Sequence, residues 1–213
     1  MKIGIIGATG KAGSLIVNEA IKRGHEVTAI VRDAAKVQNA QINVVEKNVF
    51  DLTSADLEKV DVIVNAFNSA PGQEEQHIEA GKVLIEALKG AANTRLVVVG
   101  GAGSLFVDEA KTTRVFETPD FPKEYFPTAS NMGKNLEELQ NTNGIQWTYI
   151  SPGGFFNPAG KRTGAYQKGG DILTLNSKGD SYISYADYAI AVLDEIENPQ
   201  SINKRFSVVG EAE

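Results

Sequence analysis

Three glycines near the N-terminus have the composition and position of a phosphate-binding turn. The segment Gly7-Ala8-Thr9-Gly10-Lys11-Ala12-Gly13 follows an apolar run, Ile3-Gly4-Ile5-Ile6, and precedes an amphipathic stretch. This order predicts a buried strand, a tight turn and the start of a helix. A diphosphate binds the free N–H groups and positive dipole end of such a helix, and side chains in the turn would hold it away.

Each residue of this turn has an expected part in binding a nucleotide. Gly7 and Gly10 would let the backbone and the phosphates approach one another, and Gly13 would let the helix lie close to the strand. Thr9 and Lys11 would supply further donors, and Ala12 completes the first helical turn. The spacing is G-x-x-G-x-x-G rather than the common G-x-G-x-x-G. A tight turn without a ligand is the alternative.

Arg32 follows the second predicted strand, Glu26 to Val31, and bears on the choice of dinucleotide. An acidic residue there would bind the ribose hydroxyls of NAD, whereas a guanidinium pairs with a 2′-phosphate. Asp33 comes one position later and is expected to turn away. NADP(H) is therefore favoured over NAD(H), unless Arg32 is only a solvated loop cation.

Further candidates lie where later strands end, because ligands of open α/β sheets bind at the carboxyl edge. Asp51 could accept a hydrogen bond from the adenine amino group while Leu52 packs on the ring; Asp51 could equally be a turn or cap residue. The remaining expected cofactor contacts are Ala66 and Phe67, beside the ribose and phosphates, and Gly100 and Gly101, beneath the nicotinamide.

Candidate reaction and acceptor residues follow the fifth and sixth predicted strands. Ser104 is the expected polar group near the reacting ring, and Tyr125 is a weaker candidate. Pro152 and Phe155 would contact a flat acceptor by packing and stacking. Phe155 and its neighbour Phe156 could instead fill the core.

Alternating strands and helices must position these residues. Apolar, strand-like runs recur between segments of helical periodicity, which predicts one α/β domain over residues 1–213 with a doubly wound parallel sheet and a small C-terminal extension on the substrate side. The expected strands are 3–6, 26–31, 42–46, 61–66, 96–99, 147–150 and 206–209, and the expected longer helices cover about 11–22, 71–89, 130–141 and 184–198.

Two further features leave alternatives open. His77 shares an apolar helix face with Gly81, Leu84 and Leu88, so it is expected to be packed rather than catalytic. The irregular segment 106–127 contains Thr118-Pro119-Asp120-Phe121-Pro122 and Phe126-Pro127, which oppose long regular structure. It is either a substrate lid or a packing or oligomer contact.

Composition excludes several classes of function. A net charge of −6 with no basic cluster argues against a nucleic-acid surface. The absence of cysteine excludes disulfides, thiolate catalysis and cysteine–zinc sites, and two histidines leave no histidine-rich metal site. No apolar run reaches membrane-spanning length, and the first strand leaves no room for a signal peptide. A cytoplasmic protein without a metal is expected.

The chain resembles an atypical, short member of the short-chain dehydrogenase/reductase superfamily. It is most similar to the NAD(P)-binding NmrA-like and NADH-flavin reductase group, and to biliverdin-IXβ (flavin) reductase. The resemblance spans the chain and rests on the glycine turn, Val31-Arg32, Trp147-Thr148 with Ser151-Pro152, Arg162-Thr163-Gly164-Ala165-Tyr166, and Ser181-Tyr182-Ile183-Ser184 with Asp187 and Ala189. It implies a Rossmann fold, NADP(H), and reduction of flavins or similar planar acceptors such as a quinone or tetrapyrrole.

One departure from ordinary short-chain dehydrogenases limits the chemistry. Those enzymes use a tyrosine four residues before a lysine, which lowers the phenol pKa so that it can protonate a carbonyl oxygen. None of the six tyrosines has that lysine, and Tyr125 is followed four positions later by Ala129. Direct hydride transfer to a flavin survives this loss. The alternative is an NADP(H)-binding redox sensor of the NmrA type, acting on a regulatory partner or as a homodimer.

Overall fold

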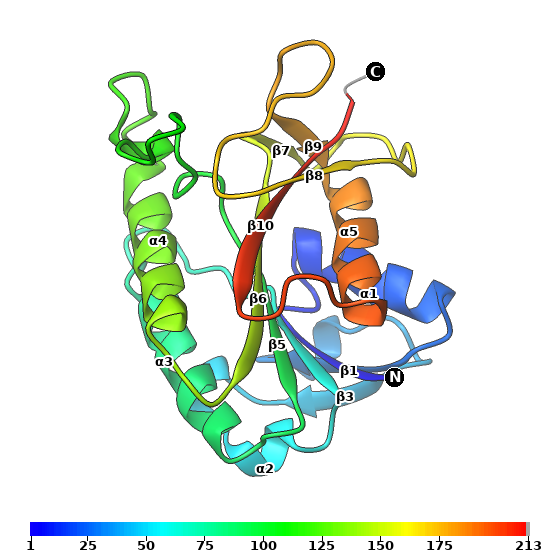
Figure 1. Cartoon of the computed structure of the whole chain (residues 1–213). Coiled ribbons are helices and arrows are strands. Elements are labelled where there is room, and N and C mark those ends of the chain that lie inside the picture. Colours follow the sequence, from blue (N-terminus) through cyan, green and yellow to red (C-terminus); the bar gives the residue numbers. More distant parts are fainter. Residues whose placement is uncertain (212–213) are drawn as a thin grey trace.

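An eight-stranded, mostly parallel sheet forms the centre of the computed structural model, which describes residues 1–211 (Figure 1). All neighbouring strands are parallel except β8 and β10, which are antiparallel. The order across the sheet is β3 (Asn43–Glu46), β2 (Glu26–Val31), β1 (Lys2–Ile6), β4 (Val62–Asn65), β5 (Arg95–Val99), β6 (Gln146–Pro152), β10 (Lys204–Val209) and β8 (Gln167–Gly169).

Helices cover both faces of this sheet, as the nearly continuous apolar sequence of its central strands requires. One face carries α1 (Lys11–Lys22) and α5 (Tyr185–Glu197), and the other carries α3 (Gln76–Lys89) and α4 (Phe126–Gln140), with the short α2 (Ser54–Leu57) at the lower end in Figure 1. The predicted doubly wound Rossmann fold is confirmed. None of the helices among residues 1–211 is long and apolar enough to span a bilayer.

The strand order reverses between β1 and β4, the two strands that flank the glycine turn. Ile6 pairs with Ile30 of β2 on one side and with Asn65 of β4 on the other. In an open parallel sheet, such a reversal separates the connections that leave the two strands and opens a crevice at their carboxyl ends. The turn that follows Ile6 therefore lies at the ligand-binding position of the fold.

A small two-stranded parallel sheet extends this carboxyl edge. It pairs β7 (Phe155–Asn157) with β9 (Tyr182–Ser184), at the top of the molecule in Figure 1. The segment 160–173, part of the C-terminal extension expected on the substrate side, contributes β8 to the main sheet, where Lys168 pairs with Val208. Its partner strand β10 is distant in sequence, so no local sequence pattern could predict this pairing.

Two helix boundaries differ from the sequence-based expectation. The α3 helix begins at Gln76 rather than at Pro71, because Gly72 has a left-handed backbone (φ 82°) that a right-handed helix cannot contain. The α4 helix begins at Phe126 rather than near Ser130. Pro127 lies in its first turn, where the N–H that proline lacks would have no helical partner.

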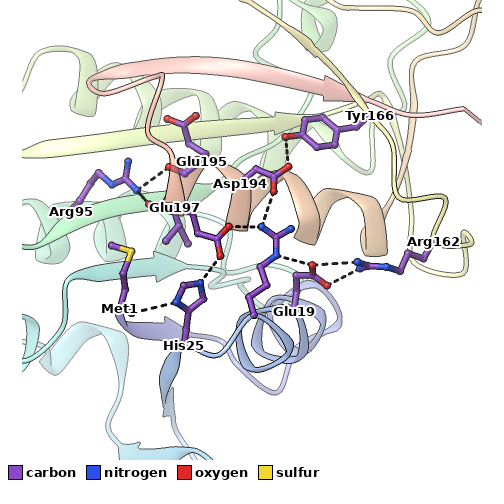
Figure 2. A network of polar contacts seen from close by, with 11 residues as sticks. Met1, Glu19, His25, Arg95, Arg162, Tyr166, Asp194, Glu195 and Glu197 are labelled. Atoms are coloured by element: carbon purple, nitrogen blue, oxygen red, sulfur yellow. Dashed lines mark hydrogen bonds and ion pairs between the residues drawn. The ribbon is translucent and has the colours of Figure 1, made fainter.

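A buried carboxylate fastens α1 to the C-terminal third of the chain (Figure 2). Glu19 is only 5% exposed and accepts hydrogen bonds from Arg23 Nε (2.9 Å) and Arg162 Nη1 (2.7 Å). Arg23 Nη1 also donates to Asp194 (2.7 Å) and Glu197 (2.8 Å) of α5. Burial alone would raise the pKa of Glu19, but the Arg162 and Arg23 guanidinium groups lower it below its usual range.

Replacing this carboxylate should destabilise the fold measurably. We expect Glu19→Gln to lower the free energy of unfolding by about 1–3 kcal/mol, because both guanidinium groups lose a charged acceptor. Urea denaturation measures this change. The control is Glu86→Gln, whose exposed ion pair with Lys89 should contribute less than about 1 kcal/mol.

Wild type and Glu19→Gln also test how the free energy of unfolding depends on pH. A carboxylate whose folded pKa is lowered stabilises the fold above its unfolded pKa of about 4.5, and that stability is lost as the pH falls through the folded pKa. The difference between wild type and Glu19→Gln should therefore be full at pH 7 and shrink below about pH 4. A difference that stays constant down to pH 3 would contradict the ionic role of Glu19.

Candidate functional site

The glycine turn is built from backbone contacts that leave no room for side chains. Gly7 has a left-handed backbone (φ 73°), and a Cβ on it would lie 2.5 Å from the carbonyl oxygen of Ala66. A Cβ on Gly13 would overlap the carbonyl oxygen of Gly7. The start of α1 is thus pressed against the ends of β1 and β4, and only glycine permits this approach.

The first turn of α1 presents backbone donors without acceptors. The N–H of Gly10 donates to Gly7 O (2.8 Å) and that of Ser14 to Gly10 O (2.9 Å). Between them, the N–H groups of Lys11, Ala12 and Gly13 find no acceptor among residues 1–211, and the helix has neither a side-chain N-cap nor an acid in its first turn.

Three free donors at the positive end of a twelve-residue helix fit an anionic ligand. The close backbone packing around Gly7 and Gly13 keeps this surface free of side chains at those positions. The geometry thus matches what the sequence pattern predicts for a diphosphate cradle, and Thr9 is exposed within it.

Arg32 and Asp33 lie in different environments at the end of β2. Asp33 Oδ1 accepts from the N–H of Ala35 (3.1 Å), and its other carboxylate oxygen lies 3.6 Å from Lys36 Nζ, so the carboxylate belongs to a 3₁₀ turn. The Arg32 side chain is exposed and makes no ion pair within the described part of the chain. A guanidinium, not a carboxylate, is therefore available beside this edge.

The Asp51, Leu52 and Phe67 side chains differ in how far they reach solvent. Asp51 is exposed at the end of the 3₁₀ helix η2 (Val49–Asp51), whose N-cap is Asn48, so the cap role considered for Asp51 falls to another residue. Leu52 is 5% exposed and packs in the core, which leaves it little surface for an adenine ring. Phe67 is half-buried.

His77 packs beneath Phe67. The two rings meet edge to face with centroids 5.5 Å apart, and Phe67 meets Phe50 in the same way at 5.8 Å. Burial lowers the pKa of His77, so the ring is neutral at pH 7. The expected packing role fits, although Nε2 has no hydrogen-bond partner within residues 1–211.

Tyr149 supports Gly100 and Gly101 from below. A Cβ on Gly100 would overlap the Tyr149 ring, and the N–H of Gly101 donates to the Tyr149 hydroxyl oxygen (3.3 Å). That hydroxyl in turn donates to Met132 O (3.4 Å) of α4. Burial raises the pKa of Tyr149 to about 12, so it stays protonated.

Sequence reasoning missed Tyr149 and Met132. Tyr149 lies in a strand whose sequence is typical of buried core, and Met132 Sδ lies 3.3 Å from the Cβ position of Gly101 only because of how α4 is oriented. Neither fact has a local sequence signal.

Ser104 and Tyr125, the two candidate reaction residues, lie in contrasting surroundings. Ser104 is 3% exposed, and its carbonyl and hydroxyl oxygens accept from Arg205 Nη1 at 2.9 and 3.0 Å. Arg205 Nε also donates to Asp171 (2.9 Å). Tyr125 is 60% exposed at the start of α4. The Ser104 hydroxyl therefore belongs to a buried network, although its own proton remains free to donate.

The segment after Gly103 is fastened to the body of the protein over much of its length. The N–H of Val115 donates to Leu105 O (2.8 Å), that of Phe116 to Gly103 O (3.0 Å), and that of Leu173 to Phe106 O (2.8 Å). Of the two alternatives for the segment 106–127, these bonds favour packing over a lid for its first part.

The two aromatic residues after β6 point to opposite sides. Phe156 packs against Tyr185 (ring centroids 3.8 Å apart) and the buried Tyr188, which matches the core-filling alternative. Phe155 is 61% exposed and borders a cavity of about 640 Å³, whereas Pro152 is buried. Of these residues, Phe155 alone offers a ring face to an acceptor.

A methyl group at position 7 should damage the cradle more than the fold. Gly7→Ala and Gly24→Ala both place a side chain on a left-handed backbone, at a cost of about 1–2 kcal/mol each. Only at Gly7 does the new Cβ meet another residue, because nothing lies within 4 Å of the Gly24 position. Calorimetry should therefore show NADPH affinity reduced at least tenfold in Gly7→Ala and unchanged in Gly24→Ala. Equal affinity in both variants would contradict the cradle.

Comparisons with known proteins agree with this geometry. A family model described as NAD(P)H-binding matches residues 7–199. The Bacillus subtilis protein YwnB is 67% identical over the full length of both chains. A solved structure from Streptococcus pneumoniae, described as that of a proposed NADH-flavin reductase, is 44% identical with a TM-score of 0.94, covering 99% of this chain and 100% of the other.

A more distant relative carries a named activity. The NAD(P)H azoreductase of Xenophilus azovorans is 25% identical over 97% of this chain and 67% of its own. The family match therefore extends from the glycine turn to the end of α5. The chain therefore belongs to the NAD(P)H-binding family, which its resemblance to atypical short-chain dehydrogenases/reductases implied.

Proposed function

We propose that this protein reduces a flavin, or a similar planar acceptor such as a quinone or tetrapyrrole, with NADPH as the preferred hydride donor. The observation that carries the proposal is the open cradle at the start of α1. Within residues 1–211 its three N–H groups have no acceptor, and the nearby Arg32 guanidinium makes no ion pair. The cradle gives a dinucleotide its place, and Arg32 selects the form that carries a 2′-phosphate.

Each residue along the carboxyl edge is assigned to one part of the dinucleotide. The Lys11, Ala12 and Gly13 amides bind the diphosphate, and Thr9 adds a hydroxyl. Asp51 accepts from the adenine amino group. Ala66 and Phe67 border the ribose, and the Leu52 side chain supports this region from within the core.

The nicotinamide end rests on Gly100 and Gly101, which Tyr149 fixes from below. Reduced nicotinamide supplies a hydride, and a flavin that accepts it takes one proton from water. The chain therefore has to align two flat rings and exclude alternative geometries, which requires positioning rather than an acid. The lack of a Tyr–Lys pair and the buried position of the Ser104 hydroxyl both suit this chemistry.

The named relatives support the choice of acceptor. One is described as a proposed NADH-flavin reductase and the other as an NAD(P)H azoreductase. Flavins and azo compounds are both planar conjugated systems that accept a hydride without an enzyme carbonyl-protonating group. The acceptor class of this chain is inferred to be the same.

A second candidate function is an NADP(H) sensor that reports redox state to a protein partner. The observation that favours it is the placement of the two candidate reaction residues, since Ser104 is buried at 3% exposure and Tyr125 lies in open solvent. A sensor would bind the coenzyme and turn nothing over.

Turnover with flat acceptors separates the two functions. We expect NADPH oxidation, followed at 340 nm, when a free flavin or a quinone is added. Ser104→Ala and Tyr125→Phe should each slow it by less than about tenfold, because neither residue supplies an essential proton. A loss of several orders of magnitude in Ser104→Ala would show that acid catalysis operates, and coenzyme binding without oxidation by any acceptor would favour the sensor.

Removing the Arg32 guanidinium tests the coenzyme preference. We expect Arg32→Ala to weaken NADPH binding by about 10- to 100-fold, as for loss of a charge-assisted bond of about 1.5–3 kcal/mol, and to leave NADH binding unchanged. Lys36→Ala, a nearby exposed cation paired with Asp33, is the control and should change neither. Calorimetric titration with both coenzymes is the measurement, and equal wild-type affinity for the two would refute the preference.

A further inference from the structure

The cavity beside Phe155 is formed where β7 and β9 meet Glu211. The N–H of Gly154 donates to Ser181 Oγ (2.9 Å) and that of Phe155 to Ser181 O (2.7 Å), which fixes this wall to the end of β6. Its volume is about 640 Å³. The lining residues are Phe155, Asn157, Ala159, Gly160, Lys161, Thr163, Asp180, Ser181, Tyr182 and Glu211.

This cavity adjoins the expected position of the nicotinamide. The N–H of Gly100 donates to Ile150 O (2.9 Å), so Gly101 lies level with the end of β6, three residues or about 10 Å of extended chain before Phe155. The sheet order places β6 three strand spacings, or about 14 Å, from the cradle on β1. An acceptor stacked on a nicotinamide over β5 would extend toward Phe155.

The cavity offers a ring face at its mouth and hydrogen-bonding groups within. Phe155 is exposed and tilts against Tyr182, with ring centroids 5.7 Å apart. The hydroxyls of Ser181 and Tyr182 accept from Gly154 and Asn157, so their protons remain available to a ligand. Carboxylate oxygens supply the acceptors. Such a mixture of donors and acceptors suits a polyhydroxylated chain.

Glu211 contributes a negative charge to the lining of the cavity. Glu211 accepts from the N–H (3.1 Å) and hydroxyl (2.8 Å) of Ser177, and these bonds lower its pKa, so it is ionised at pH 7. Gly210 is held by Tyr182 and Asn176, which keeps Glu211 in place. With Asp180 and Glu211 against Lys161, the formal charge of the lining is −1.

We propose that this cavity receives the uncharged polyhydroxylated chain of a planar acceptor, so that the protein prefers riboflavin to phosphorylated flavins. The preference rests on the proposed reductase function. In the reaction, NADPH gives up a hydride and becomes NADP⁺, and the flavin ring gains that hydride together with one proton from water. A phosphate on the polyhydroxylated chain would bring a third negative group beside Asp180 and Glu211.

Initial rates with riboflavin and FMN at saturating NADPH and low salt test the preference. We expect kcat/KM for riboflavin to exceed that for FMN by roughly three- to tenfold, the size of repulsion between a phosphate dianion and one charge at about 8 Å in water. The double variant Asp180→Asn/Glu211→Gln changes the formal charge of the lining from −1 to +1 and should reduce the ratio to one or below. Glu58→Gln, which removes an exposed charge next to α2 at the opposite edge, should leave it unchanged.

Flavin fluorescence titration gives a second readout that does not require turnover. Tighter binding of riboflavin than FMN, weakened for both in Phe155→Ala, supports the cavity assignment even if NADPH is not oxidised, in which case only the reductase function fails. NADPH oxidation with FMN at least as fast as with riboflavin, in wild type and double variant alike, overturns the preference while the reductase function stands. Absence of binding for both flavins also overturns it.

Discussion

The contact between the start of α1 and the ends of β1 and β4 determines what this protein can bind. Gly13 lies against the carbonyl of Gly7, and Gly7 against the carbonyl of Ala66, at distances that exclude even a methyl group. This packing places the positive end of a twelve-residue helix at the point where the strand order reverses. Because of that placement, the amides of Lys11, Ala12 and Gly13 have no acceptor within residues 1–211, and the proposed affinity for a diphosphate depends on these amides.

The same helix also joins the two halves of the site. Glu19, two turns beyond the cradle, accepts from Arg162 in the segment that lines the cavity and from Arg23, which in turn reaches α5 (Figure 2). On the same wall, Asp187 of α5 accepts from the N–H groups of Thr163 and Gly164. The carboxyl edge of the sheet and the proposed acceptor cavity are therefore connected through charged groups at helix surfaces, while the apolar core beneath supplies most of the stability.

Local chemistry explains which features could be predicted. The glycine turn and the second strand with Arg32 each depend on neighbours within a few residues, and the structure has both as expected. The features that could not be predicted from the sequence depend on residues distant in the chain. The Ser104 oxygen accepts from Arg205, Leu52 faces the core, β8 pairs with β10, and Tyr149 supports Gly101. Sequence periodicity shows that a residue is buried but not which group its polar atom meets.

The central claim is that the backbone of the first turn of α1 holds the diphosphate. Amide resonances in a ¹H–¹⁵N spectrum of the labelled protein test it directly during titration with NADPH. The account predicts that the signals of Lys11, Ala12 and Gly13 shift most, because these N–H groups gain an anionic acceptor. Saturating NADPH that leaves these three signals in place while shifting others, such as those around Phe155, would contradict it.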